Sequence, residues 1–391
     1  MKKNIFLGSA AALTIAFTMS GAAWAADAQA VADAVTAQLA NQGVKLDIGS
    51  AANDGDDIVF SDVKITPTDL ETAEVGEIVL EDVEEDGGGY IIGRIAAPAF
   101  TKEKDGKKLE FGGAEINDLR VPAQDEADPI RKLMLASGAS VGAITVSDES
   151  GQIFTMKGGT MTMSPYEPGG TMTYEAAISG ITADMSKLPD EKSRMTMAAL
   201  GYETLTGDMT YTGSWNTTDG RMTLDDMAFD IDDAAVLKMS FDISGYTPQF
   251  VSALQDMQKQ MSEGKVDQQA QGLAMLGLMQ QLTFNGMQIR IEDASLTGKL
   301  LDFFGKQQGA DGNAMAQQLK GMLPFMLGQL GNPEFAANVS SAVGTYLDNP
   351  KSLTITAAPA SPVPAAQIMA AGMSAPQTIP DVLGVVVTAN D

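Results

Sequence analysis

Apolar and polar residues alternate one for one through most of the chain between Val44 and Gly245. The alternation is clearest at 172–178, 209–215 and 237–243, where every second residue is mostly Met, Leu, Ile, Phe, Tyr or Trp. A period of two predicts β-strands with one apolar and one polar face. The polar connection at 216–220 predicts a hairpin, and a change of phase at Asp225-Asp226 predicts a β-bulge. A chain of this kind must form an antiparallel sheet that is apolar on one side.

After residue 248 the pattern becomes helical. Apolar residues recur at intervals of three and four in two stripes, Phe250, Leu254, Met257, Met261 and Met315, Leu319, Met322, Met326. Asn332-Pro333-Glu334 has the residues of a helix start, and 27–41 predicts a further helix near the N-terminus. The predicted fold class is α+β and β-rich, a curved antiparallel sheet or part-barrel. Amphipathic helices, concentrated in the C-terminal part, are expected to cover one face.

The remaining C-terminal segments are short. We expect a strand pair at 282–296, a strand at 352–356 and a last strand at 382–388. Proline in the Pro/Ala-rich passage 357–380 predicts an extended loop or edge. The change of pattern, together with a concentration of acidic residues before it, divides the chain into a β-rich region at 26–248 and a helix-rich region at 249–391.

Residues 1–25 have the pattern of a secretory signal peptide. Lys2 and Lys3 precede an apolar stretch at 5–17, and Ala23-Trp24-Ala25 forms a small-x-small cleavage site. Cleavage near Ala25 predicts an exported, soluble protein of the periplasm. The rest of the sequence contains no apolar run long enough to predict a stable membrane span.

The sequence contains no histidine and no cysteine, which excludes Ser-His-Asp and Cys-His catalysis and zinc sites built on those residues. Gly138–Gly142 matches G-x-S-x-G, but the histidine base of that motif is missing. We therefore predict no catalytic residues, no metal site and no cofactor. Clusters of acids, such as 81–86, predict solvated faces, and calcium binding there stays open. The net charge of −26 argues against nucleic acid and anionic membranes as partners.

Methionine is abundant, with 24 residues. Flexible thioether side chains suit irregular apolar surfaces, either in a packed core or in a ligand groove. If a groove is present, the two helical stripes are its predicted lining: Phe250, Leu254, Met257, Met261, Met315, Leu319, Met322 and Met326.

The run ALGYETL at 199–205 and the following GDMTYTGSWNTTDGRMTLDDMAFDI resemble uncharacterised exported proteins of proteobacteria. The C-terminal stretch beginning NPKSLTITAAPASPVP is similar to them as well. More distantly, these strand-turn-strand segments resemble the AsmA-like and YdgA-like envelope proteins. That resemblance implies an elongated β-rich fold and lipid handling or outer-membrane maintenance, and it carries over no site residues. AsmA-like proteins are typically longer and membrane-anchored.

Three functional hypotheses follow. The first is a non-enzymatic periplasmic protein that binds an apolar or lipid-like ligand or supports cell-envelope integrity. The second is a structural module that binds another envelope protein. The third is a carboxylate-based hydrolase acting on glycans, which would need two acids facing one cleft.

Overall fold

The computed structural model describes residues 26–41, 43–66, 72–262 and 268–391. The predicted signal peptide at 1–25 lies outside the described residues. Within the described part of the chain, no helix is both long and apolar enough to cross a bilayer.

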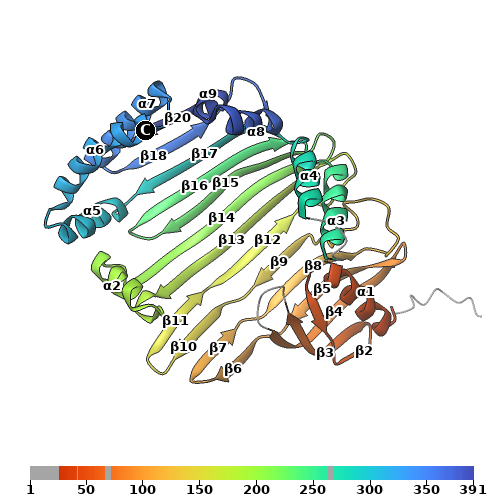
Figure 1. The fold of residues 1–391 in the computed structure, drawn as a ribbon. Coiled ribbons are helices and arrows are strands. Elements are labelled where there is room, and N and C mark those ends of the chain that lie inside the picture. The colour runs from red at the N-terminus through yellow and green to blue at the C-terminus, as the bar shows by residue number, and fades with distance from the viewer. Residues whose placement is uncertain (1–25, 42, 67–71, 263–267) are drawn as a thin grey trace, which may run out of the picture.

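The described strands form one open, antiparallel sheet that does not close into a barrel (Figure 1). The first strands along the chain are β1 (Lys45–Asp47), β2 (Ser50–Asp54), β3 (Asp57–Thr66), β4 (Ala73–Asp86), β5 (Gly89–Ala97), β6 (Phe100–Lys104), β7 (Lys107–Phe111), β8 (Ala114–Val121), β9 (Gly138–Val141) and β10 (Ile144–Asp148). They are followed by β11 (Gly151–Met156), β12 (Gly158–Met163), β13 (Thr171–Asp184), β14 (Thr204–Asn216), β15 (Arg221–Ile231), β16 (Ala235–Ser244), β17 (Thr283–Asp293), β18 (Ser352–Ala357), β19 (Val363–Pro364) and β20 (Val385–Ala389).

Most of the helices follow β16, as the sequence predicts. They are α1 (Ala28–Asn41), α2 (Glu191–Leu200), α3 (Pro248–Ser262), α4 (Gln268–Met279), α5 (Leu296–Gln307), α6 (Gly312–Gly328), α7 (Pro333–Asp348), α8 (Ala365–Ser374) and α9 (Ile379–Val382), with short 3₁₀ turns at Met185–Lys187 and Pro376–Thr378. The predicted β-rich α+β class is confirmed. The sheet runs on across residue 248, because β16 pairs with β17. The division of the chain into two regions there stays a prediction.

Local features follow from their sequences. The register between β14, β15 and β16 shifts beside Asp225-Asp226, which confirms the predicted β-bulge. The connection at 216–220 joins β14 to β15 as the expected hairpin. The Asn332 side chain accepts a hydrogen bond from the Phe335 N–H at 3.0 Å and so caps α7.

Two predictions about the C-terminal part are wrong. The segment 282–296 holds one strand, β17, and then starts α5, because its strand partners β16 and β18 come from elsewhere in the chain. The Pro/Ala-rich passage contains α8, since its prolines flank the helix rather than interrupt it. α6 runs on across Pro324, which lies inside the helix.

Cross-strand pairing defines two chemically different faces. On one face, directly opposite residues form apolar rows across β12–β18 and β20; one row runs Met161, Ala176, Tyr211, Met227, Met239, Ile289, Ile355 and Val387. A second row runs Gly159, Ile178, Met209, Phe229, Leu237, Ile291, Leu353 and Ala389. The matching row on the opposite face runs Thr160, Ala177, Thr210, Ala228, Lys238, Arg290, Thr354 and Thr388. We call these the apolar face and the polar face.

A line of glycines crosses the sheet between β7–β8, β9–β10 and β11–β12. A Cβ on Gly142 would lie 2.5 Å from the Gly112 carbonyl oxygen. The two backbone segments can therefore approach this closely only because residue 142 has no side chain. Glycines at such positions allow strands to bend, and bent strands curve a sheet.

The most completely buried core lies at the N-terminal end, where α1 packs against the sheet. Its side chains include Val31, Ile58, Val63, Leu80 and Ile92. Ile95 and Ile116 of the apolar face contact this cluster, which places α1 on the apolar side.

Candidate functional site

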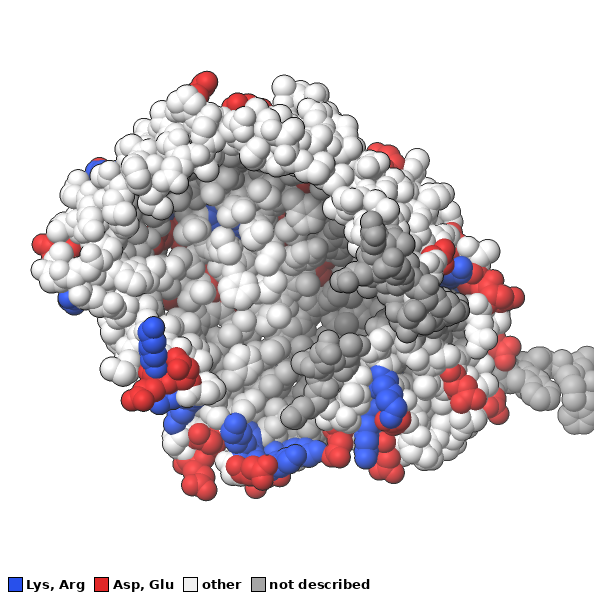
Figure 2. Space-filling view, viewed as in Figure 1, with Lys and Arg blue, Asp and Glu red and all other residues white. Residues whose placement is uncertain are grey.

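The apolar face of the sheet forms the floor of a wide trough. Figure 2 shows a hollow on this side of the molecule, and α1, α2 and α5 pack on the apolar face. α2 and α5 contact Leu205 and Ile231, and α7 lies along β20. The helices therefore line the margins of this face and leave its middle open, rather than covering it.

Large apolar side chains on the floor remain accessible. Met161, Phe229, Leu237 and Ile355 are 39%, 38%, 37% and 36% exposed. Their row neighbours, including Met209, Met227, Met239 and Ile291, are half-buried. Buried residues of a closed core would be out of contact with water, so this face is a surface and not an interior.

One margin of the trough is fixed by polar contacts between α2, α5 and α7. The Tyr202 and Ser295 hydroxyls are 2.9 Å apart, and the Lys299 ammonium lies 3.7 Å from the centre of the Tyr202 ring. The Tyr346 hydroxyl lies 2.6 Å from the Thr297 hydroxyl and donates to Asp293 at 3.3 Å. Burial raises the pKa of Tyr346, so the phenol remains a donor.

The opposite margin is fixed by aromatic packing. Trp215, on the apolar face, donates its indole N–H to the Tyr246 carbonyl oxygen at 2.7 Å. The Tyr246 ring lies 5.8 Å from that of Trp215 and 5.0 Å from that of Phe250, at the start of α3. These contacts hold α3 at the ends of β14 and β16.

The β20 edge is closed by a side chain. Asn338 of α7 donates to the Val387 carbonyl oxygen at 3.1 Å and accepts from the Val387 N–H at 2.9 Å. These are the backbone groups that Val387 turns away from β18. The amide thus satisfies a position at which another strand would otherwise pair.

The predicted lining residues lie on different walls (Figure 1). Phe250 is buried in the aromatic cluster, and Leu254 and Met257 of α3 are half-buried. The side chain of Met261 lies outside the described residues. On α6, Met315 and Leu319 are half-buried, whereas Met322 and Met326 are exposed. The structure does not bring the two stripes together into one surface.

The larger apolar surface lies on the strands, whose apolar face the sequence predicts to be covered by helices. Phe229, Leu237, Met239 and Ile289 belong to strands whose alternation is plain in the sequence. Alternation identifies an apolar face but does not say whether another layer covers it. One feature of the sequence does indicate an open face. It predicts few helices in relation to the many strands whose apolar side they would have to cover.

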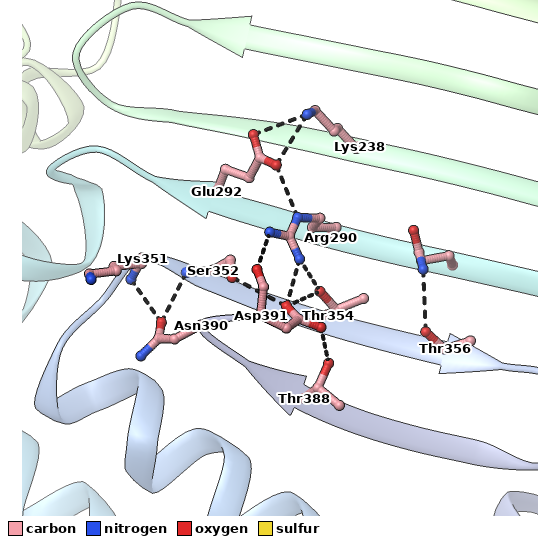
Figure 3. Close-up of polar contacts among 11 residues, drawn as sticks. Lys238, Arg290, Glu292, Lys351, Ser352, Thr354, Thr356, Thr388, Asn390 and Asp391 are labelled. Carbon is pink, nitrogen blue, oxygen red and sulfur yellow. Dashed lines mark hydrogen bonds and ion pairs between the residues drawn. The ribbon is translucent and has the colours of Figure 1, made fainter.

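A second polar cluster lies on the polar face, and its charged side chains pair with one another (Figure 3). Arg290 donates to the Asp391 carboxylate at 2.7 Å and to Glu292 at 3.0 Å, and Lys238 lies 3.1 Å from Glu292. Hydrogen bonds from Thr388 and Arg290 lower the pKa of Asp391 to about 2. The cluster fastens the last residues to β17 and β18 and leaves the Arg290 charge compensated.

A cleft of about 470 Å³ also opens on the polar face, lined by Val79, Ala96, Glu115 and Ser140. Arg94 stands in it but forms ion pairs with Glu81 and Glu115, which compensate its charge. Among the described residues, no three acidic side chains come together in a way that could hold a metal ion. The trough is therefore the more informative candidate site.

Comparison with known proteins adds little chemistry. A family model whose description reads "Uncharacterized protein" matches residues 228–390. The match begins near the end of β15 and includes the floor strands β16–β18 and β20 with the margin helices α3–α9. No curated protein matches the chain.

Proposed function

We propose that this protein is an exported, periplasmic carrier that binds an apolar or lipid-like ligand in the trough, without catalysing a reaction. The observation that supports the proposal is the continuous apolar face, whose large side chains stay accessible between walls of helices. Contiguous exposed apolar surface of this extent is typical of binding sites in soluble proteins.

The dimensions suit a hydrocarbon chain. The apolar rows cross β12–β18 and β20, which are seven steps between neighbouring strands. At about 4.8 Å a step, the floor is roughly 34 Å long. One leaflet of a bilayer core is about 15 Å deep, so an extended acyl chain fits within the floor.

The chemistry of the floor favours binding of a ligand's hydrocarbon tail over binding of its polar head group. The two apolar rows contain no charged residue. Tyr174, which lies beside them, donates its hydroxyl to the Thr223 carbonyl oxygen at 2.8 Å, and Trp215 donates to Tyr246. Because these donors are used internally, binding would come from burial of hydrocarbon.

Native mass spectrometry of protein purified from the periplasm without detergent tests the proposal. We expect a mass in excess of the chain that solvent extraction releases as a lipid. A clean chain mass, together with no uptake of the neutral fluorescent probe 1-N-phenylnaphthylamine by the purified protein, would refute it.

The alternative is a structural module that binds another envelope protein. Pairing of such a partner with β20 loses support, because Asn338 occupies that edge. A glycan hydrolase would need two acids facing one cleft, and no two acids lie in the apolar rows.

A further inference from the structure

Part of the trough's rim carries no charge although the protein carries many. Three helical segments that are far apart in sequence, Gly272–Met279 of α4, 321–331 at the end of α6, and Ala365–Ser374 of α8, contain no Asp, Glu, Lys or Arg. We call them the uncharged rim. In Figure 2, charged side chains gather along the lower edge of the hollow, near α2, β6 and β7. The upper rim, where α4, α6 and α8 lie, has few.

Large apolar side chains stand out from these segments. Phe325 is 75% exposed and Met373 is 84% exposed. The other large apolar residues exposed on the uncharged rim are Leu273, Met275, Leu276, Met279, Met322, Met326 and Leu330. Met322, Phe325 and Met326 are spaced at i, i+3 and i+4, so they lie together on one outward face of α6. This face is turned away from the packing of α6 on α5 and α7 through Ala316.

We propose that the uncharged rim is a docking surface for the interface of a zwitterionic lipid bilayer. It would place the open side of the trough against the layer from which a lipid enters, and in that sense the inference rests on the proposed function. A helix with an apolar face binds an interface through buried apolar area plus any attraction to anionic lipids. Here only the first contribution is available, because the polar positions on these segments are Gln, Gly and Ser.

Charge also favours this partner over others. The net charge of −26 repels the protein from an anionic surface, so approach to a bilayer is least opposed where the lipid is neutral and the protein surface uncharged. The hot spots of protein interfaces are usually built around Trp, Tyr or Arg, and none of these residues lies in the three segments. The large exposed residues of the rim are Met, Leu and Phe alone.

Flotation with vesicles of pure phosphatidylcholine tests the inference, using protein that begins at Ala26 so that the apolar segment at 5–17 contributes nothing. We expect the protein to float, more strongly with small, highly curved vesicles, and to stay bound when salt is raised to about 1 M, where charges are screened within about 3 Å. The double variant F325E/M326E should need at least about tenfold more lipid for half-maximal binding. Gln318→Glu, an exposed position on the same helix outside the rim, should leave binding unchanged.

Absence of flotation, binding that needs anionic lipid or is lost in salt, or equal binding by F325E/M326E would each overturn the inference. So would a lipid-free dimer that the double variant abolishes, since a second copy would then be the occupant. Because Phe325 and Met326 are exposed, the unfolding midpoint of the variant should match that of the parent. The trough is tested separately, with 1-N-phenylnaphthylamine in solution. Probe binding without flotation refutes the rim alone, and flotation without probe binding refutes the trough alone.

Discussion

Phe229 lies near the middle of the floor, and replacing it with aspartate tests the trough directly. A phenylalanine has about 200 Å² of surface to bury. Phe229 is 38% exposed, so roughly 75 Å² are left for a ligand to cover. At about 25 cal/mol per Å², loss of that contact costs roughly 2 kcal/mol, or a factor of about 25 in Kd. The carboxylate adds a desolvation penalty, so we expect Phe229→Asp to weaken probe binding at least 25-fold.

Ala228→Asp is the matched control. It introduces the same carboxylate one residue earlier in β15, but on the polar face and directly opposite Lys238. We expect unchanged probe affinity and unchanged stability. Phe229→Asp gives up the roughly 125 Å² of the side chain that are already buried, about 3 kcal/mol, which leaves a domain of typical stability folded. Titration with 1-N-phenylnaphthylamine and urea unfolding measure the two quantities. Equal affinity of the two variants for the probe would show that the floor is not the binding surface.

Three further changes test the supporting structure. A Cβ on Gly213 would lie 2.3 Å from the Thr223 carbonyl oxygen and 2.4 Å from the Tyr174 ring; Gly213→Ala should therefore lower the free energy of unfolding by about 1–3 kcal/mol in urea, whereas an unchanged midpoint would contradict the close contact. Asn338→Ala should cost about 1–2 kcal/mol and promote self-association through β20 in sedimentation, whereas a monomer at all concentrations would show that Asn338 does not protect the edge. The pKa of Asp391 is lowered from 3.8 to about 2, so its carboxylate contributes stability above pH 4 that is lost as the pH falls toward 2; Asp391→Asn should flatten that part of the pH–stability curve, and a parallel curve would refute the contribution.

The sequence predicts the fold class because its two signals are local. Alternation at 209–215 and 237–243 identifies strands, the phase change at Asp225-Asp226 identifies the bulge, and Asn332-Pro333 identifies the start of α7. Each depends on neighbours within a few residues. Strand partners do not, and the expected strand pair at 282–296 failed because β17 pairs with distant strands, Asp293 opposite Ala235 of β16 and Met287 opposite Ala357 of β18.

The candidate site was harder to predict for a physical reason. Met315, Leu319, Met322 and Met326 form one helical stripe in sequence, yet the first two pack and the last two face outward. Whether an apolar residue is covered depends on the tertiary arrangement of layers, and alternation or helical spacing is the same in both cases. The open face of the sheet appears only when the helices are seen at its margins.

An uncovered apolar sheet would normally aggregate, and features of the chain oppose that outcome. The net charge of −26 keeps molecules apart. Asn338 occupies the backbone of β20, and the edge strand β6 carries Lys and Glu residues that discourage pairing. Curvature at the glycine crease recesses the floor between the helices, so that flat surfaces are not brought together. These devices would be superfluous around an ordinary core, which is protected by being covered. Their presence around an open face is what a protein needs if that face is to remain accessible to a small apolar ligand.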